Sequence, residues 1–277
     1  MIRPLIFTDM DGTLLDHDTY SWQSAAAALN LCHSLNVPVI PCTSKTLAEC
    51  LELQKNIQLP GPAIYENGSG STLPKDQFPQ QNRFIEDSTC PDRWRVEFSM
   101  PYTELRKCLE QLKHQFQFTG FGDMSVEHIQ KHTGLSAHSA ELARQRLHSE
   151  PMVWNDAPER IDEFKKALSQ FGLSLTQGGR FYHALQKVDK GQAMRWLAKQ
   201  YQQIWSCETR IIALGDGNND LPMLEKADIA VVIKNPYKAP LKLAANPRQT
   251  QIFTDLPGPE GWNQAILQLL KKETLHG

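Results

Sequence analysis

The 277-residue sequence lacks several features that would assign it to a specialised class of protein. Its six cysteines show no CxxC spacing, which is typical of reduced thiols rather than of a disulfide framework or a cysteine metal site. No apolar run reaches the length of a membrane-spanning helix. The run at residues 5–7 is too short for a secretory signal, and Thr8 and Asp9 follow it at once. These absences lead us to expect a cytoplasmic protein.

An excess of charge of one sign is also missing. Lys and Arg number 29 and Asp and Glu number 31, which gives a formal net charge of −2 at pH 7. A chain without a basic excess offers no electrostatic footprint for nucleic acid or an anionic membrane, so we expect neither partner. An anionic small molecule would have to be held by local cations or by a metal ion. The residues indicate no particular oligomeric state.

Three short apolar runs predict buried strands, and each of them ends in polar residues. The runs cover residues 5–8, 37–41 and 211–214, and helical patterns cover 21–36, 46–56, 190–202 and 258–272. Near-continuous apolar runs that alternate with helices are typical of a parallel sheet covered on both faces. Ligands of such sheets bind at the carboxyl ends of the strands, where these polar residues fall.

A central stretch has a different pattern and predicts an inserted α+β module. Strand patterns lie at 93–100, 173–178 and 180–185, and helical patterns lie at 102–116, 136–147 and 159–171. We therefore divide the chain into a first core segment (1–86), an insert (87–185) and a second core segment (186–277). The predicted fold class is α/β, a Rossmann-like parallel-sheet core that carries an α+β insert.

The first strand ends in the motif DMDGT, which contains Asp9 and Asp11. Asp, Gly and Thr are ordinary turn residues, so a simple turn is one interpretation. The functional interpretation makes Asp9 a nucleophile that forms an aspartyl-phosphate and Asp11 a general acid/base. Because two carboxylates repel a phosphate dianion, this interpretation requires cations from elsewhere in the chain.

Two later motifs can supply those cations. Lys190 opens a helix after Asp189, a position that the helix dipole disfavours for lysine, although a solvated surface lysine is the ordinary alternative. The stretch GDGNND follows the third strand and offers hard oxygen ligands from Asp216, Asn219 and Asp220. Such ligands suit Mg²⁺, which is usually held by one or two carboxylates together with phosphate. We therefore predict Mg²⁺ as the cofactor.

The motif CTSKT follows the second strand and predicts an anion site. Thr43, Ser44 and Thr46 offer hydroxyl and backbone N–H groups where a helix begins, and Lys45 adds a charge. A plain helix N-cap is the structural alternative, and both interpretations are compatible.

Together the four motifs resemble the haloacid dehalogenase (HAD) superfamily of phosphohydrolases. The resemblance implies that Asp9 is the nucleophile, that Asp11 is the acid/base, that Thr43 binds phosphate and that Lys190 orients it. It also implies a Mg²⁺ site built from Asp9, the main-chain carbonyl of Asp11, Asp216, Asn219 and Asp220. The insert then corresponds to the superfamily's α/β cap of the Cof-like (C2B) type.

Within the superfamily, the sequence looks most like the mannosyl-3-phosphoglycerate phosphatase branch. The resemblance rests on TSKT, YENGSG, TGLSAHSAELARQR followed by SEPMVW, and GGRFYHALQKVDKG. It implies a substrate with a phosphate, a carboxylate and a sugar, which is hydrolysed to mannosylglycerate and phosphate. The residues expected to bind the substrate are Ser44, Lys45, Thr46, Glu66, Asn67, Arg180 and His183.

Other interpretations remain open at this point. Arg180 also suits a surface position beside a turn, His183 a partly buried strand position, and ENGSG a hairpin turn. A general sugar-phosphate phosphatase of the Cof or sucrose-phosphatase type is the alternative function, as is a phosphomannomutase-like transferase. A non-catalytic phosphosugar-binding protein is less consistent with the residues, because binding alone requires no nucleophile–acid pair.

Overall fold

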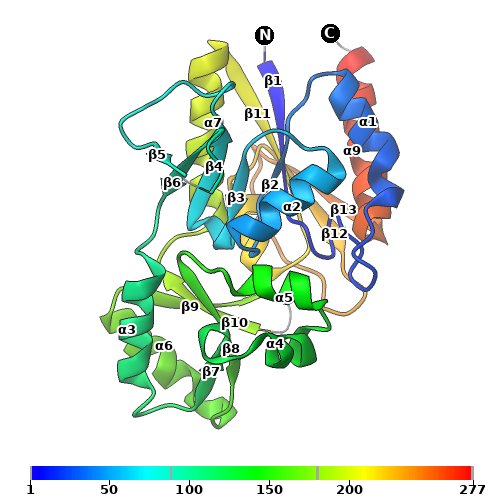
Figure 1. The fold of residues 1–277 in the computed structure, drawn as a ribbon. Helices are drawn as coiled ribbons and strands as arrows, with labels where there is room; N and C mark the ends of the chain where they lie inside the picture. The colour runs from blue at the N-terminus through cyan, green and yellow to red at the C-terminus, as the bar shows by residue number, and fades with distance from the viewer. Residues whose placement is uncertain (1, 88, 179–180, 276–277) are drawn as a thin grey trace.

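The computed structural model describes residues 2–87, 89–178 and 181–275, and a parallel sheet lies at its centre (Figure 1). Its five strands lie in the order β13-β12-β11-β1-β2 and are all parallel. Their bounds are β1 Ile2–Thr8, β2 Val39–Pro41, β11 Glu208–Gly215, β12 Ile229–Lys234 and β13 Thr250–Pro257. The predicted α/β class and its parallel core are confirmed.

Helices cover both faces of this sheet, as the apolar runs predict. Helices α1 (Ala26–Ser34) and α9 (Gly258–Leu275) pack on one face, while α7 (Lys190–Trp205) and α8 (Leu221–Lys226) pack on the other (Figure 1). Within β1, Leu5 and Phe7 contribute to the α7 side and Ile6 to the α9 side. Because successive side chains of a strand point to opposite faces, a strand buried on both faces carries apolar residues throughout.

A second, antiparallel sheet extends the core beyond β2 and corrects one predicted boundary. Its order is β3-β4-β6-β5, with bounds β3 Ala63–Tyr65, β4 Gly70–Pro74, β5 Ile85–Glu86 and β6 Arg93–Glu97. Strand β6, which we assign to the insert from sequence, pairs with β4, and its Trp94 and Val96 join the core cluster of Leu5 and Phe7. The structure thus places β6 with the core. An alternating strand pattern does not specify which sheet the strand joins.

The insert folds into a cap with its own antiparallel sheet, in the order β7-β8-β10-β9. The strand bounds are β7 Phe118–Gly120, β8 Ser149–Trp154, β9 Leu173–Gly178 and β10 Phe181–Gln186. Helices α3 (Tyr102–Leu112) and α6 (Ile161–Gln170) pack on one face, and α4 (Val126–Thr133) and α5 (Ala137–Arg144) on the other. Helix α5 contacts α2 (Leu47–Ile57) of the core, so the cap lies over the carboxyl ends of the core strands (Figure 1). Among the described helices, none is both long and apolar enough to cross a membrane.

Candidate active site

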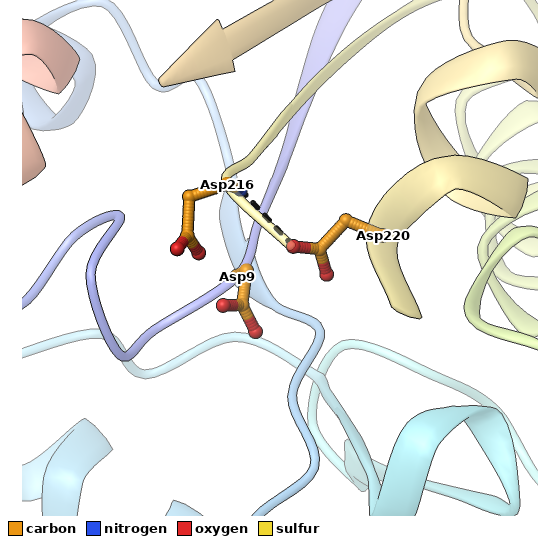
Figure 2. A group of neighbouring side chains, drawn as sticks. All are labelled: Asp9, Asp216 and Asp220. Atoms are coloured by element: carbon orange, nitrogen blue, oxygen red, sulfur yellow. Dashed lines mark hydrogen bonds between the residues drawn. The ribbon is translucent and has the colours of Figure 1, made fainter. Parts of the chain in front are cut away.

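Three carboxylates from two segments of the chain meet at the carboxyl end of the parallel sheet. Asp9 directly follows β1, Asp216 follows β11, and Asp220 lies one short 3-10 turn later. Strands β1 and β11 are in parallel register, and the backbone N–H of Asp9 donates to the carbonyl of Leu214 over 2.9 Å. Figure 2 shows the three side chains converging, and their ligand oxygens lie within 4.8 Å of one another.

Lys190 contacts two carboxylates of the acidic cluster, which is defined here as Asp9, Asp216 and Asp220. Its fully buried Nζ is 2.6 Å from Oδ1 of Asp9 and 2.6 Å from Oδ1 of Asp220. Burial acts to lower the pKa of Lys190, but the carboxylates of Asp220 and Asp9 raise it above its ordinary value, so the ammonium stays charged. The alternative of a solvated surface lysine is therefore wrong.

The remaining charge of the acidic cluster suits a divalent cation. When all three carboxylates are ionised, the ammonium of Lys190 balances only one of their three negative charges. Burial raises the pKa of Asp9 well above its usual range, and repulsion from Asp220 and Asp216 adds to this effect. Burial and Asp220 likewise raise the pKa of Asp216. Clustered carboxylate oxygens are hard ligands, so the residues present fit Mg²⁺.

Neighbouring groups hold the carboxylates of Asp216 and Asp220 in place. The Thr13 hydroxyl donates to Oδ1 of Asp216 over 3.2 Å, and the Asn235 amide donates to Oδ2 over 2.5 Å. Oδ2 of Asp220 accepts the backbone N–H groups of Asp216 and Gly217. Sequence reasoning missed Thr13 and Asn235. Asn235 directly follows strand β12, just as Asp216 directly follows β11, so the search for polar residues at strand ends could have found it.

Asp11 lies beside the acidic cluster but pairs with a different cation. Its Oδ2 is 2.9 Å from Nζ of Lys45, which is also 3.8 Å from Glu49. The Asp11 side chain is 36% exposed, in contrast to the buried Asp9. Burial acts to lower the pKa of Lys45, and Asp11 and Glu49 raise it above its ordinary value. Lys45 thus contacts the predicted acid/base directly.

The CTSKT loop meets the core on one side and the cap on the other. The buried Thr43 hydroxyl accepts the backbone N–H of Lys45, and the Ser44 carbonyl accepts Nη1 of Arg146 over 2.8 Å. Thr46 is the N-cap of α2 in a capping box with Glu49, and its hydroxyl also donates to the carbonyl of Leu142. We therefore do not keep Thr46 as a substrate contact, because the hydroxyl is fully buried and engaged.

The other predicted substrate contacts have different outcomes. Glu66 has no exposed surface, and its carboxylate accepts hydrogen bonds only from the cap segment 147–149 among the described residues. It is therefore not kept as a substrate contact. Oδ1 of Asn67 accepts a hydrogen bond from the side-chain amide of Asn219 over 3.2 Å. Asn219, a predicted metal ligand, is therefore bonded to the loop that contains Glu66. Arg180 lies outside the described residues.

His183 lies on the cap sheet, and its ring is buried. Nδ1 has no hydrogen-bond partner within the described part of the chain. Burial, with the nearby charges of Arg146 and Lys190, lowers the pKa of His183 to about 3, so the ring is neutral. Arg146, which sequence reasoning missed, thus lies close to both the CTSKT loop and His183.

A cavity of about 190 Å³ opens beside Lys190 between core and cap. Its lining comes from the core and from cap strand β9 and consists of Asn67, Thr176, Gln177, Val188, Asp189, Lys190, Asn218, Asn219 and Pro222. Polar residues of both the core (Asn67, Asn219) and the cap (Thr176) thus contribute to its lining.

A parallel α/β core with carboxylates at its strand ends, covered by an inserted cap, defines a capped α/β protein with an acidic site at the carboxyl edge of its sheet. Comparison with known proteins specifies the class further. The sequence model of the haloacid dehalogenase-like hydrolases matches residues 6–247, so the chain belongs to this family and is an enzyme. A phosphatase of Methanococcoides burtonii, named for glucosyl-3-phosphoglycerate and mannosyl-3-phosphoglycerate, is 37% identical over 276 residues, 98% of each chain. The predicted resemblance is confirmed.

Solved structures support the fold. A haloalkanoate-superfamily phosphatase of Bacteroides thetaiotaomicron superposes with a TM-score of 0.65 at 20% identity, covering 96% of this chain and 95% of the other. The sucrose-phosphatase of a Synechocystis species, solved with sucrose and phosphate, gives a TM-score of 0.62 at 17% identity, covering 97% and 98%. At identities this low, the similarity shows a shared fold and not a shared function.

Proposed function

We propose that the protein is a Mg²⁺-dependent phosphomonoesterase that hydrolyses mannosyl-3-phosphoglycerate, or a close glycosyl analogue, through an aspartyl-phosphate on Asp9. The observation that carries the proposal is the buried contact of Lys190 with Asp9 and Asp220 next to Asp216. Binding of a phosphosugar alone would not require a buried carboxylate held by a lysine beside a second acid. The 37% identical phosphatase supports the choice of substrate.

The residues of the chain divide the chemistry between them. The Asp9 carboxylate attacks phosphorus and forms a new O–P bond, while the bond from phosphorus to the glycerate oxygen breaks. Asp11 gives its proton to that leaving oxygen. It then takes a proton from the water that attacks phosphorus, which releases phosphate and restores Asp9. Lys190 holds Asp9, and the Thr43 region accommodates phosphate oxygens.

Asp9, Asp216, Asp220 and the Asp11 carbonyl would hold Mg²⁺ together with the Asn219 amide. When bound, Mg²⁺ supplies positive charge that reduces the repulsion between the carboxylates and the phosphate. Lys45 orients the Asp11 carboxylate through their direct contact. The chain already brings together the carboxylates that would hold the metal ion, and it places Lys45 in contact with Asp11.

The substrate's glycerate carboxylate calls for a cation outside the acidic cluster. Arg146 and Lys45 lie at the junction of core and cap, and the neutral His183 offers an unpartnered ring nitrogen among the described residues. We propose that these groups, with Ser44, Asn67 and Arg180, select the substrate. The enzyme would act in the cytoplasm on a small molecule, with no nucleic-acid partner.

Phosphate release from a substrate panel tests this proposal. The panel contains mannosyl- and glucosyl-3-phosphoglycerate, mannose 6-phosphate and sucrose 6-phosphate, each with Mg²⁺ and with EDTA. We expect a strong preference for a glycosyl-phosphoglycerate and no turnover in EDTA. Equal, weak turnover of the whole panel would favour a general sugar-phosphate phosphatase, and an isomerised sugar phosphate would indicate a mutase.

A further inference from the structure

The Glu66 carboxylate forms a hydrogen-bonded link from the core to the cap. Its Oε1 accepts the backbone N–H of Leu147 over 2.8 Å. Its Oε2 accepts the N–H of His148 over 3.0 Å and both the N–H and the hydroxyl of Ser149 over 2.7 Å. A buried carboxylate is costly unless hydrogen bonds satisfy it, and here four donors of one cap segment do so.

The backbone around Glu66 is bonded to the CTSKT loop. The N–H of Glu66 donates to the carbonyl of Lys45, and the N–H of Asn67 donates to the carbonyl of Thr43, each over 2.9 Å. Glu66 and Asn67 adopt positive φ angles of 46° and 58°, a conformation that residues with a Cβ rarely adopt. Such a conformation persists only where the surrounding contacts determine it.

The same loop touches the segment that carries Lys190. Gly68 has a φ of 93°, and a Cβ at this position would lie 2.5 Å from the carbonyl oxygen of Asp189 and 2.8 Å from the nitrogen of Lys190. The loop 66–68 therefore packs directly against the start of α7. Three segments meet at it: the CTSKT loop, the helix start with Lys190, and the cap segment 147–149.

We propose that Glu66 is a positioning residue that couples docking of the cap to alignment of Thr43 and Lys190. With the cap docked, the four donors hold the carboxylate and keep the loop 66–68 in its left-handed conformation. Without them the loop relaxes, and both the CTSKT loop and the start of α7 lose a fixed neighbour. Glu66 itself contacts neither substrate nor metal in this role, which rests on the proposed phosphatase function.

Glu66→Gln tests this coupling, with Glu150→Gln as its matched control. The glutamine keeps the volume but turns an NH₂ group toward backbone donors. Glu150 is also a buried carboxylate, but it accepts from Tyr102 and Gly122 inside the cap. With p-nitrophenyl phosphate, which has no sugar for the cap to hold, we expect kcat to fall about 10- to 100-fold in Glu66→Gln, with a nearly unchanged KM. The control should stay within a few-fold of wild type.

Hydrogen exchange of the unliganded protein gives a readout that does not depend on activity. In Glu66→Gln we expect faster exchange at 147–149 and also at 43–46 and 66–68. Faster exchange confined to 147–149 with an unchanged kcat would overturn the proposal. An equal loss of kcat in the Glu150→Gln control would do so as well, since it would indicate general cap instability.

Ser149→Ala provides a milder test if Glu66→Gln does not fold. It removes one of the four donors, so we expect the same exchange pattern and a few-fold loss of kcat. Wild-type exchange and kcat in Ser149→Ala would contradict the coupling. Failure of the proposed function would look different, because the wild-type protein would then release no phosphate from glycosyl-phosphoglycerates, whatever the exchange pattern of the variants.

Discussion

The acidic cluster and the core–cap junction both bury carboxylates, but they satisfy them in different ways. Asp9, Asp216 and Asp220 face one another, and the charge of Lys190 balances part of their charge, which leaves a site that would fit the proposed divalent cation. Glu66 relies instead on backbone donors of the cap. A cluster balanced by cations can bind a further anion such as phosphate, whereas a carboxylate balanced by N–H groups fixes two segments of chain together.

This difference predicts that variants of the cluster abolish chemistry or metal binding, while variants of the junction change alignment and substrate selection. The largest effect should come from Asp9→Asn, which keeps the shape but removes the nucleophile. We expect phosphate release to fall by about 10³-fold or more. Activity within tenfold of wild type would rule out Asp9 as the nucleophile.

Lys190→Met should combine a loss of activity with a loss of stability. Removing a buried cation leaves its carboxylate partners unpaired, so we expect unfolding free energy to drop by about 3–5 kcal/mol. The matched control is Lys107→Met, whose ammonium pairs with Glu104 on an exposed helix surface and should contribute at most about 1 kcal/mol. Urea unfolding measures both, and equal stability of the two variants would contradict the assigned role of Lys190.

Asn235→Ala should weaken Mg²⁺ binding, because the amide holds the Asp216 carboxylate. Loss of such a supporting hydrogen bond typically costs about 10- to 100-fold in metal affinity. Arg146→Ala, at the junction, should leave Mg²⁺ affinity unchanged and raise KM for the glycosyl-phosphoglycerate. Calorimetric titration of Mg²⁺ into both variants compares the two regions directly. A similar loss of affinity in both would remove the distinction between them.

The smallest effect concerns pH and His183. Its pKa is lowered to about 3 in the folded protein, against an ordinary value of 6.5. Between these values the unfolded chain binds one more proton, so stability falls as the pH falls, by up to about 1.4 kcal/mol per pH unit. His183→Gln should remove this slope between pH 6.5 and 5, and the exposed His33→Gln should not. Denaturant unfolding at several pH values measures it, and identical slopes would contradict the neutral buried ring.

The contrast between the regions also explains what the sequence predicts. Asp9, Asp216 and Lys190 are recognisable because polar residues at the ends of apolar runs stand out, and parallel strands bring their carboxyl ends together. Most partners of Glu66 are backbone groups about 80 residues away, and the Ser44 carbonyl that accepts from Arg146 is 102 residues away; every residue has such groups. The sheet that β6 joins depends on the same kind of long-range contact. Local sequence patterns therefore predict the chemistry better than the junction that aligns it.

A phosphoenzyme trap tests the central claim, the covalent role of Asp9, most directly. In Asp11→Asn with Mg²⁺ and p-nitrophenyl phosphate, the good leaving group needs no protonation, but water lacks its base, so a phosphoenzyme should accumulate. Acid quenching and peptide mass mapping should then find the phosphoryl group on the peptide that contains Asp9, and not in the Asp9→Asn/Asp11→Asn double variant. A phosphoryl group on another residue, or none while p-nitrophenol is still released in a burst, would contradict the account.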